Sequence, residues 1–164
     1  MNEYRSGIEE TLKPTALKFF ATFSRFEFAL KRGGYVSGLT GRSASPNWTQ
    51  FGNDLGVDFY NQMKSAEPAK VFFENSPKRL IVKAERGVEF IDQVAPVNTQ
   101  TLLEAVSLVR NNLFHGEKAI LGERDELLLS AALFVLDSAF QAAQQRYGLR
   151  PVCEAFRYAP IDAH

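Results

Sequence analysis

Hydrophobic residues recur at helical spacing along most of this chain. A first helix is expected between about Thr15 and Lys31, and its apolar face is made of Ala16, Phe20, Phe23 and Leu30. Gly33-Gly34 ends that helix, and Lys31 and Arg32 suit its negative C-terminal end. The stretch GGYVSGLTGRSAS that follows predicts a glycine- and serine-rich loop.

A second helix is predicted to start at Ser45-Pro46, because serine is a favoured cap and proline is favoured in the first turn. It continues to about Ser65 with apolar residues at helical spacing: Trp48, Phe51, Leu55, Phe59 and Met63. Glu67-Pro68 is expected to open a short third helix that reaches Phe72 and Phe73.

Residues 77–97 interrupt the helical pattern. Two apolar runs, 80–82 and 88–91, flank the segment 84–87, which predicts either a small β-hairpin or an extended arm. Pro96 closes this insertion. The next helix is expected to start at Asn98 or at the Thr101–Glu104 pair, and Gly116 is expected to end it. Its apolar stripe is Leu102, Val106, Val109 and Leu113.

A last long helix is predicted from the acidic residues 123–126 to about Tyr147. Its first half is apolar nearly all round, so it is expected to be the central helix of a bundle or to carry a subunit interface as well. The tail, 151–164, has no predicted structure. We therefore expect one all-α domain over 1–164, an up-and-down bundle of four or five helices with an irregular or hairpin-like insertion near 77–97.

Composition narrows the class of protein. Of the 164 residues, 45% are hydrophobic, and 19 Lys+Arg balance 19 Asp+Glu. A folded chain of zero net charge is not built to coat duplex nucleic acid. The single cysteine, Cys153, excludes an internal disulfide and favours a reducing cytosol. The polar N-terminus and an apolar run at 127–136, about half a membrane span, predict a soluble cytoplasmic protein without a signal peptide or membrane partner.

Candidate chemistry gathers in VRNNLFHGEK, residues 109–118. On a helical projection, Arg110 lies about 80° from Leu102, on the shoulder of the buried stripe. His115 falls at the helix end, where the backbone dipole favours its protonated form. An arginine fork beside a titratable imidazole suits a phosphate site. The competing explanation is structural: asparagines and Gly116 end the helix, and His115 bonds a terminal carbonyl.

Glu27 is a second unusual residue, because it falls within the predicted apolar face of the first helix. A carboxylate there needs a partner, for which Arg110 or His115 is the functional candidate. Pairing with Arg25 or Lys31, or a helix rotated so that Glu27 reaches water, would be the structural alternatives.

Three stretches together resemble the HEPN superfamily (higher eukaryotes and prokaryotes nucleotide-binding). Arg110-Asn111-Asn112-Leu113-Phe114-His115-Gly116 resembles its arginine–polar–histidine signature, SRFEFALKRGGY (24–35) resembles its first helix, and residues 124–136 resemble its last helix. The resemblance covers about half of the chain. It implies a helical bundle that forms a homodimer, with the motifs of both subunits facing one cleft.

The resemblance also implies metal-independent RNA cleavage without a cofactor, in which the ribose 2′-hydroxyl attacks the adjacent phosphate and leaves a 2′,3′-cyclic end. Arg110 would bind the scissile phosphate, His115 would transfer protons, and Asn111 would orient one of them or the substrate. Some members of the superfamily only bind RNA, nucleotides or proteins, so a non-catalytic binding module is the alternative function. A toxin or defence effector, for which an antitoxin-like partner is expected, is one form of the nuclease.

The insertion carries four basic residues that could contact an RNA backbone: Lys78, Arg79, Lys83 and Arg86. A solvated charged arm is the simpler interpretation. Two histidines and one cysteine give little support for a zinc site, and Cys153 among apolar neighbours is expected to serve packing rather than nucleophilic catalysis.

Overall fold

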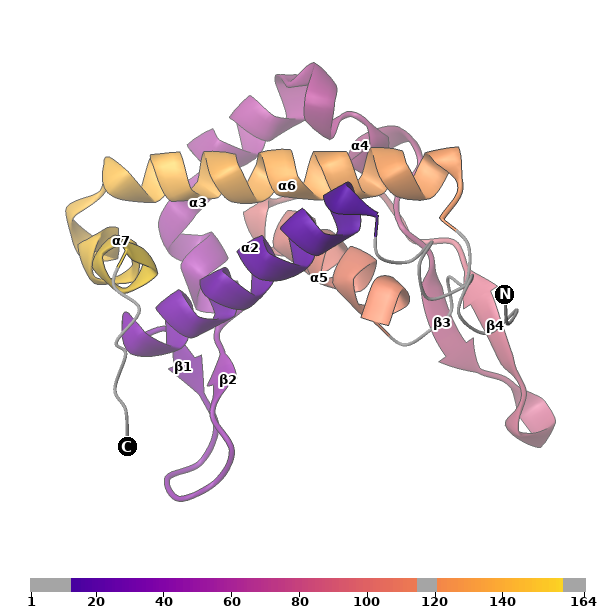
Figure 1. Cartoon of the computed structure of the whole chain (residues 1–164), viewed down its shortest axis with the longest axis horizontal. Coiled ribbons are helices and arrows are strands. Elements are labelled where there is room, and N and C mark those ends of the chain that lie inside the picture. Colours follow the sequence, from indigo (N-terminus) through magenta and orange to yellow (C-terminus); the bar gives the residue numbers. More distant parts are fainter. Residues whose placement is uncertain (1–12, 115–120, 158–164) are drawn as a thin grey trace.

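The computed structural model describes residues 13–114 and 121–157. It confirms the predicted all-α bundle with a hairpin-like insertion (Figure 1). The helices are α2 (Pro14–Arg32), α3 (Trp48–Ser65), α4 (Val71–Glu74), α5 (Thr99–Phe114), α6 (Glu123–Gln144) and α7 (Arg150–Arg157), with short 3-10 turns at Glu67–Ala69, Ala84–Arg86 and Tyr147–Leu149. Two small antiparallel hairpins pair β1 (Val36–Ser37) with β2 (Ser45–Pro46) and β3 (Arg79–Val82) with β4 (Val88–Ile91).

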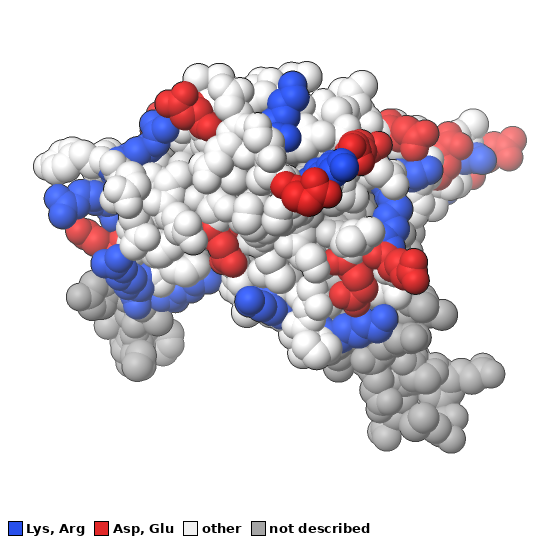
Figure 2. Space-filling model, turned by 90° about the horizontal axis from the view of Figure 1, so that it is seen from above, with Lys and Arg blue, Asp and Glu red and all other residues white. Residues whose placement is uncertain are grey.

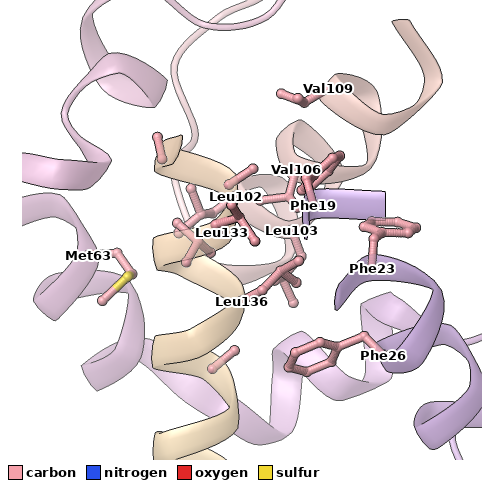
Figure 3. Close-up of a cluster of buried hydrophobic side chains, with 14 of the residues drawn as sticks. Phe19, Phe23, Phe26, Met63, Leu102, Leu103, Val106, Val109, Leu133 and Leu136 are labelled. Carbon is pink, nitrogen blue, oxygen red and sulfur yellow. The ribbon is translucent and has the colours of Figure 1, made fainter. Parts of the chain in front are cut away.

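Helix α6 runs along the length of the molecule and contacts α2, α3, α4, α5 and α7 (Figure 1). It is therefore the central helix that its apolar circumference predicted. By length and composition alone α6 could cross a membrane, but 56% of its most apolar window is buried inside the protein. Leu133 and Leu136 of α6 meet side chains of α2 and α5 in the core (Figure 3).

The apolar face of α2 differs from the predicted one. Phe19, Phe23 and Phe26 are buried, whereas Phe20, which was placed in the stripe, is 47% exposed. The helix carries apolar residues on more than one side, so its sequence allowed more than one rotation. Packing against α6 and α7 selects the rotation that is observed.

The start of α3 also corrects the prediction. Ser45-Pro46 forms strand β2 instead of opening the helix, and the side chain of Asn47 caps α3 by accepting a hydrogen bond from the backbone N–H of Gln50 at 3.0 Å. The helix is interrupted at Gly56, whose φ of 73° is favourable only for glycine. The hydroxyl of Thr99 donates to the Gly56 carbonyl at 2.6 Å, which joins α3 to the start of α5.

The tail for which no structure was predicted contains α7. Val152 and Cys153 are buried, and the Phe156 ring lies 4.9 Å from that of Phe26 in α2. The backbone of Val152 passes so close to Gly33 that an added Cβ would meet its nitrogen at 2.7 Å. The last long helix accordingly ends at Gln144, earlier than the predicted Tyr147, so that the chain can turn back toward α2.

Candidate functional site

Arg110 lies in the last turns of α5, half-buried between that helix and α2. Its guanidinium carbon is 5.8 Å from the centre of the Phe23 ring, and its Nη1 donates to Oδ1 of Asn111 at 3.2 Å. The face of an aromatic ring attracts a cation, and partial burial reduces screening of the charge by water. The side chains of Arg110 and Asn111, two predicted site residues adjacent in the chain, are thus joined by a hydrogen bond.

His115 and Gly116 lie outside the described residues. Helix α5 is described up to Phe114, so it extends through the predicted stripe to the residue before the histidine. The predicted proton-transfer role of His115 therefore stays a prediction, as does the helix stop at Gly116.

Glu27 is half-buried on α2, one turn beyond Phe23. Among the residues that the structure describes, it forms neither an ion pair nor a side-chain hydrogen bond, so the predicted pairing with Arg110 is not formed. Among the described residues, Glu27 pairs with neither Arg25 nor Lys31, the two local candidates, and the Nε of Arg25 donates to the backbone carbonyl of Phe156 at 2.8 Å. The rotation of α2 that buries Phe19 and Phe26 moves Glu27 to the edge of the apolar face.

Asn112 faces the insertion, away from Arg110. Its Nδ2 donates to the backbone carbonyl of Lys78 at 2.8 Å, which ties the end of α5 to the base of the hairpin. Arg124, in the first turn of α6, donates to the carbonyls of Asn75 and Ser76 at 3.3 and 2.8 Å. These bonds hold the segment before the hairpin against both helices.

A cavity of about 150 Å³ lies where the hairpin meets the end of α5 and the start of α6. Apolar side chains form most of its wall: Pro77, Phe90, Val109, Leu113, Leu121, Leu128 and Leu129. Four polar or charged residues complete the lining: Lys78, Asn112, Arg124 and Asp125. Apolar walls with a few polar groups are typical of small-ligand sites.

The four basic residues predicted to contact RNA are all exposed in or beside the hairpin. Two of them already have partners: Lys78 forms an ion pair with Asp92 at 3.1 Å, and Arg79 donates to Gln93 at 3.2 Å. Figure 2 shows charged side chains of both signs spread around a largely uncharged centre on the face in view, without one continuous basic patch there. For Lys78 and Arg79, these local partners favour the simpler interpretation of 77–97 as a solvated charged arm.

Other chemistry has little basis in the described residues. No group of three His, Cys, Asp or Glu side chains among them could hold a metal ion. Burial raises the pKa of the Cys153 thiol, which lies against α2 in the core and is unsuited to act as a nucleophile.

The cavity was not predicted from sequence, although Asn112 belongs to the stretch that was singled out. Its wall comes from three consecutive elements, the hairpin, α5 and α6, and their mutual packing, which no local pattern predicts, creates the space between them. The sequence had indicated other roles for several lining residues: Lys78 as a possible RNA contact, Val109 and Leu113 as core, and Arg124 and Asp125 as part of a helix start. Comparisons of the chain with protein-family models, curated proteins and solved structures found no match.

Proposed function

We propose that this protein is a metal-independent endoribonuclease whose active centre lies at the C-terminal end of α5. The observation that carries the proposal is the Arg110–His115 motif together with the position of its arginine, which is half-buried and held by Phe23 and Asn111. A fixed guanidinium fork binds two phosphate oxygens at once and is worth more in a partly shielded site than in water.

In the proposed reaction, a histidine removes the proton from a ribose 2′-hydroxyl as its oxygen attacks the adjacent phosphorus. The bond to the 5′-oxygen breaks, and a second imidazole protonates that leaving oxygen. Arg110 stabilises the additional negative charge on the phosphate oxygens. One chain supplies only one histidine in the motif, so a homodimer in which two copies of His115 face one cleft supplies both partners.

A non-catalytic module that binds RNA, a nucleotide or a protein is the competing function. The largely apolar cavity beside Asn112 favours this function, because binding a ligand there would not require a group that transfers protons. If the protein is a nuclease of the toxin or defence type, an antitoxin-like protein partner is expected to neutralise it in the cytoplasm.

The decisive experiment is cleavage of labelled single-stranded RNA and of tRNA in the presence of EDTA, with wild type compared with His115→Ala. We expect wild-type products with 2′,3′-cyclic phosphate ends and none from the variant. Arg110→Lys serves as a second comparison, because lysine keeps the charge but lacks the fork. Cleavage by His115→Ala at the wild-type rate would refute the mechanism, and RNA binding without cleavage by wild type would favour the binding module.

A further inference from the structure

We infer that the cavity between hairpin β3–β4 and the α5–α6 end binds one unpaired pyrimidine base of the RNA, and so sets the sequence preference of the nuclease. This inference rests on the proposed function, since it takes RNA as the substrate at Arg110. Proteins that recognise RNA sequence mostly do so by enclosing unstacked bases of single strands.

The size and wall of the cavity fit a single planar ring. Its volume of about 150 Å³ is roughly ten times the 10–15 Å³ that a single water needs, so it can admit a flat ring, and a one-ring base is the smaller of the two base types to be accommodated. Phe90 supplies an aromatic side chain, and Val109, Leu113 and Leu128 supply apolar contacts. Base stacking on an aromatic side chain is favourable whatever the sequence, so the ring would be held before any hydrogen bond selects it.

The polar part of the lining can recognise the edge of a base and the backbone that carries it. The Nδ2 of Asn112 is engaged with the Lys78 carbonyl, which fixes the orientation of the amide. Within the described part of the chain, Oδ1 of Asn112 accepts no hydrogen bond, so it is available to a base donor. Lys78, which is paired with Asp92, and Arg124 outnumber Asp125 among the charged residues of the lining. The excess of positive charge favours the phosphates on either side of a bound nucleotide.

The cavity also lies close to the proposed phosphate site. Val109, Asn112 and Leu113 line it from one side of α5, whereas Arg110 projects from the other side toward Phe23 of α2. A helix with its side chains is about 10–12 Å across. A single strand that crosses the end of α5 can therefore place one base in the cavity and a neighbouring phosphate at Arg110.

Binding is tested independently of cleavage with fluorescent oligoribonucleotides that are 2′-O-methylated throughout and cannot be cut by 2′-hydroxyl attack. Each oligomer is abasic except for one uracil, one cytosine, one adenine or no base. By anisotropy, we expect the full-length protein to bind the uracil or cytosine oligomer at least about tenfold more tightly than the abasic one, and the adenine oligomer more weakly than the better pyrimidine. The same oligomers, unmethylated at one position, report the preference in cleavage.

Three variants locate the effect. Leu128→Phe enlarges a wall residue into the cavity and is expected to abolish the preference for a base. Phe90→Ala removes the aromatic wall from an exposed hairpin position, where failure to fold is not expected, and should reduce the preference too. Val88→Ala is the matched control, because Val88 lies on the same strand, 57% exposed, and does not line the cavity.

The outcomes separate this inference from the proposed function. Cleavage that is indifferent to the base and unchanged by Leu128→Phe overturns the base site and leaves the nuclease intact. Base-dependent binding that is lost in Leu128→Phe and kept in Val88→Ala, without any cleavage, supports the base site and counts against the nuclease. Tighter binding of adenine than of both pyrimidines overturns the inference, as does binding that no base improves.

Discussion

The two ends of α5 are both polar, yet their side chains have different surroundings. At the N-terminal end, Oδ1 of Asn98 accepts from the backbone N–H of Thr101 at 2.9 Å, and Oγ1 of Thr101 accepts from the backbone N–H of Asn98 at 3.2 Å. This reciprocal pair is a capping box. The hydroxyl of Thr99, 2% exposed, donates to the Gly56 carbonyl at the break in α3.

At the C-terminal end, Arg110 is held by an aromatic ring and by the side chain of Asn111, while Asn112 lies at the lining of a cavity. Polar groups at the first end complete the backbone hydrogen bonding of two helices. At the second end, Asn112 lines a cavity and Arg110 carries a positive charge. Polar residues at helix ends should therefore be judged by their partners in the fold, because asparagines occur at both ends of α5 and are natural capping residues by sequence alone.

The largest effect is expected from Arg110→Ala. Loss of the phosphate-binding fork should lower RNA cleavage at least about 100-fold, while the free energy of unfolding should fall by only about 1 kcal/mol through loss of the contact with Phe23. Cleavage rates and urea unfolding of the same preparation test both statements. Unchanged cleavage together with a large loss of stability would show that the C-terminal end of α5, like its N-terminal end, serves the fold and not the reaction.

Thr99→Val should instead lower stability and leave RNA cleavage unchanged. Valine has nearly the shape of threonine but removes the hydroxyl that donates to the half-buried Gly56 carbonyl, so the free energy of unfolding should fall by about 1–3 kcal/mol. Cleavage per folded molecule should not change. Thr99→Ser retains the hydroxyl and is the control. If Thr99→Val reduced cleavage at temperatures where it is fully folded, the two ends of α5 would not be separable.

Asn98→Ala should have a smaller effect of the same kind. Loss of the cap is expected to reduce the free energy of unfolding by about 1 kcal/mol, whereas Asn98→Asp, which still accepts a hydrogen bond, should retain most of the stability. Thermal unfolding followed by circular dichroism measures both. Equal stability of the alanine and wild-type proteins would show that the capping box contributes little.

Tyr35, which precedes strand β1, provides a pH test of a polar group that is structural. Its hydroxyl donates to Asp54 at 2.6 Å, and burial, followed by that hydrogen bond and the charge of Asp54, raises the pKa of Tyr35. A raised pKa means that the folded state holds the proton more tightly, so its contribution is complete below the ordinary value of about 10 and is lost as the pH rises beyond it.

Tyr35→Phe should therefore lower the free energy of unfolding by about 1 kcal/mol at neutral pH, with a difference from wild type that shrinks above the ordinary tyrosine pKa. Denaturant unfolding at several pH values measures this difference. A constant difference across that range would contradict the assigned cause, and any change in cleavage at neutral pH would extend the functional site to α3.

Most helices could be predicted, because their apolar residues recur at helical spacing and their ends carry ordinary signals. Asn98 and the acidic start of α6 are examples. The rotation of α2 could not be predicted, because the helix has phenylalanines on two sides. Either Phe19 or Phe20 could therefore have belonged to the buried face. Helix α7 was missed because its eight residues make a short pattern that Val152, Cys153 and Phe156 complete only against α2.

By itself, the sequence determined that the chain folds as a helical bundle, that residues 77–97 leave the helical pattern, and that Arg110 falls at the shoulder of a buried stripe. These properties depend on neighbours within a few turns, where backbone geometry dictates which side chains share a face. Packing of the helices, which the sequence does not reveal, sets the contact of Arg110 with Phe23, keeps Glu27 from pairing with Arg110, and leaves a cavity lined by a hairpin and two helix ends. Such contacts join different secondary-structure elements, and their formation depends on how whole helices pack.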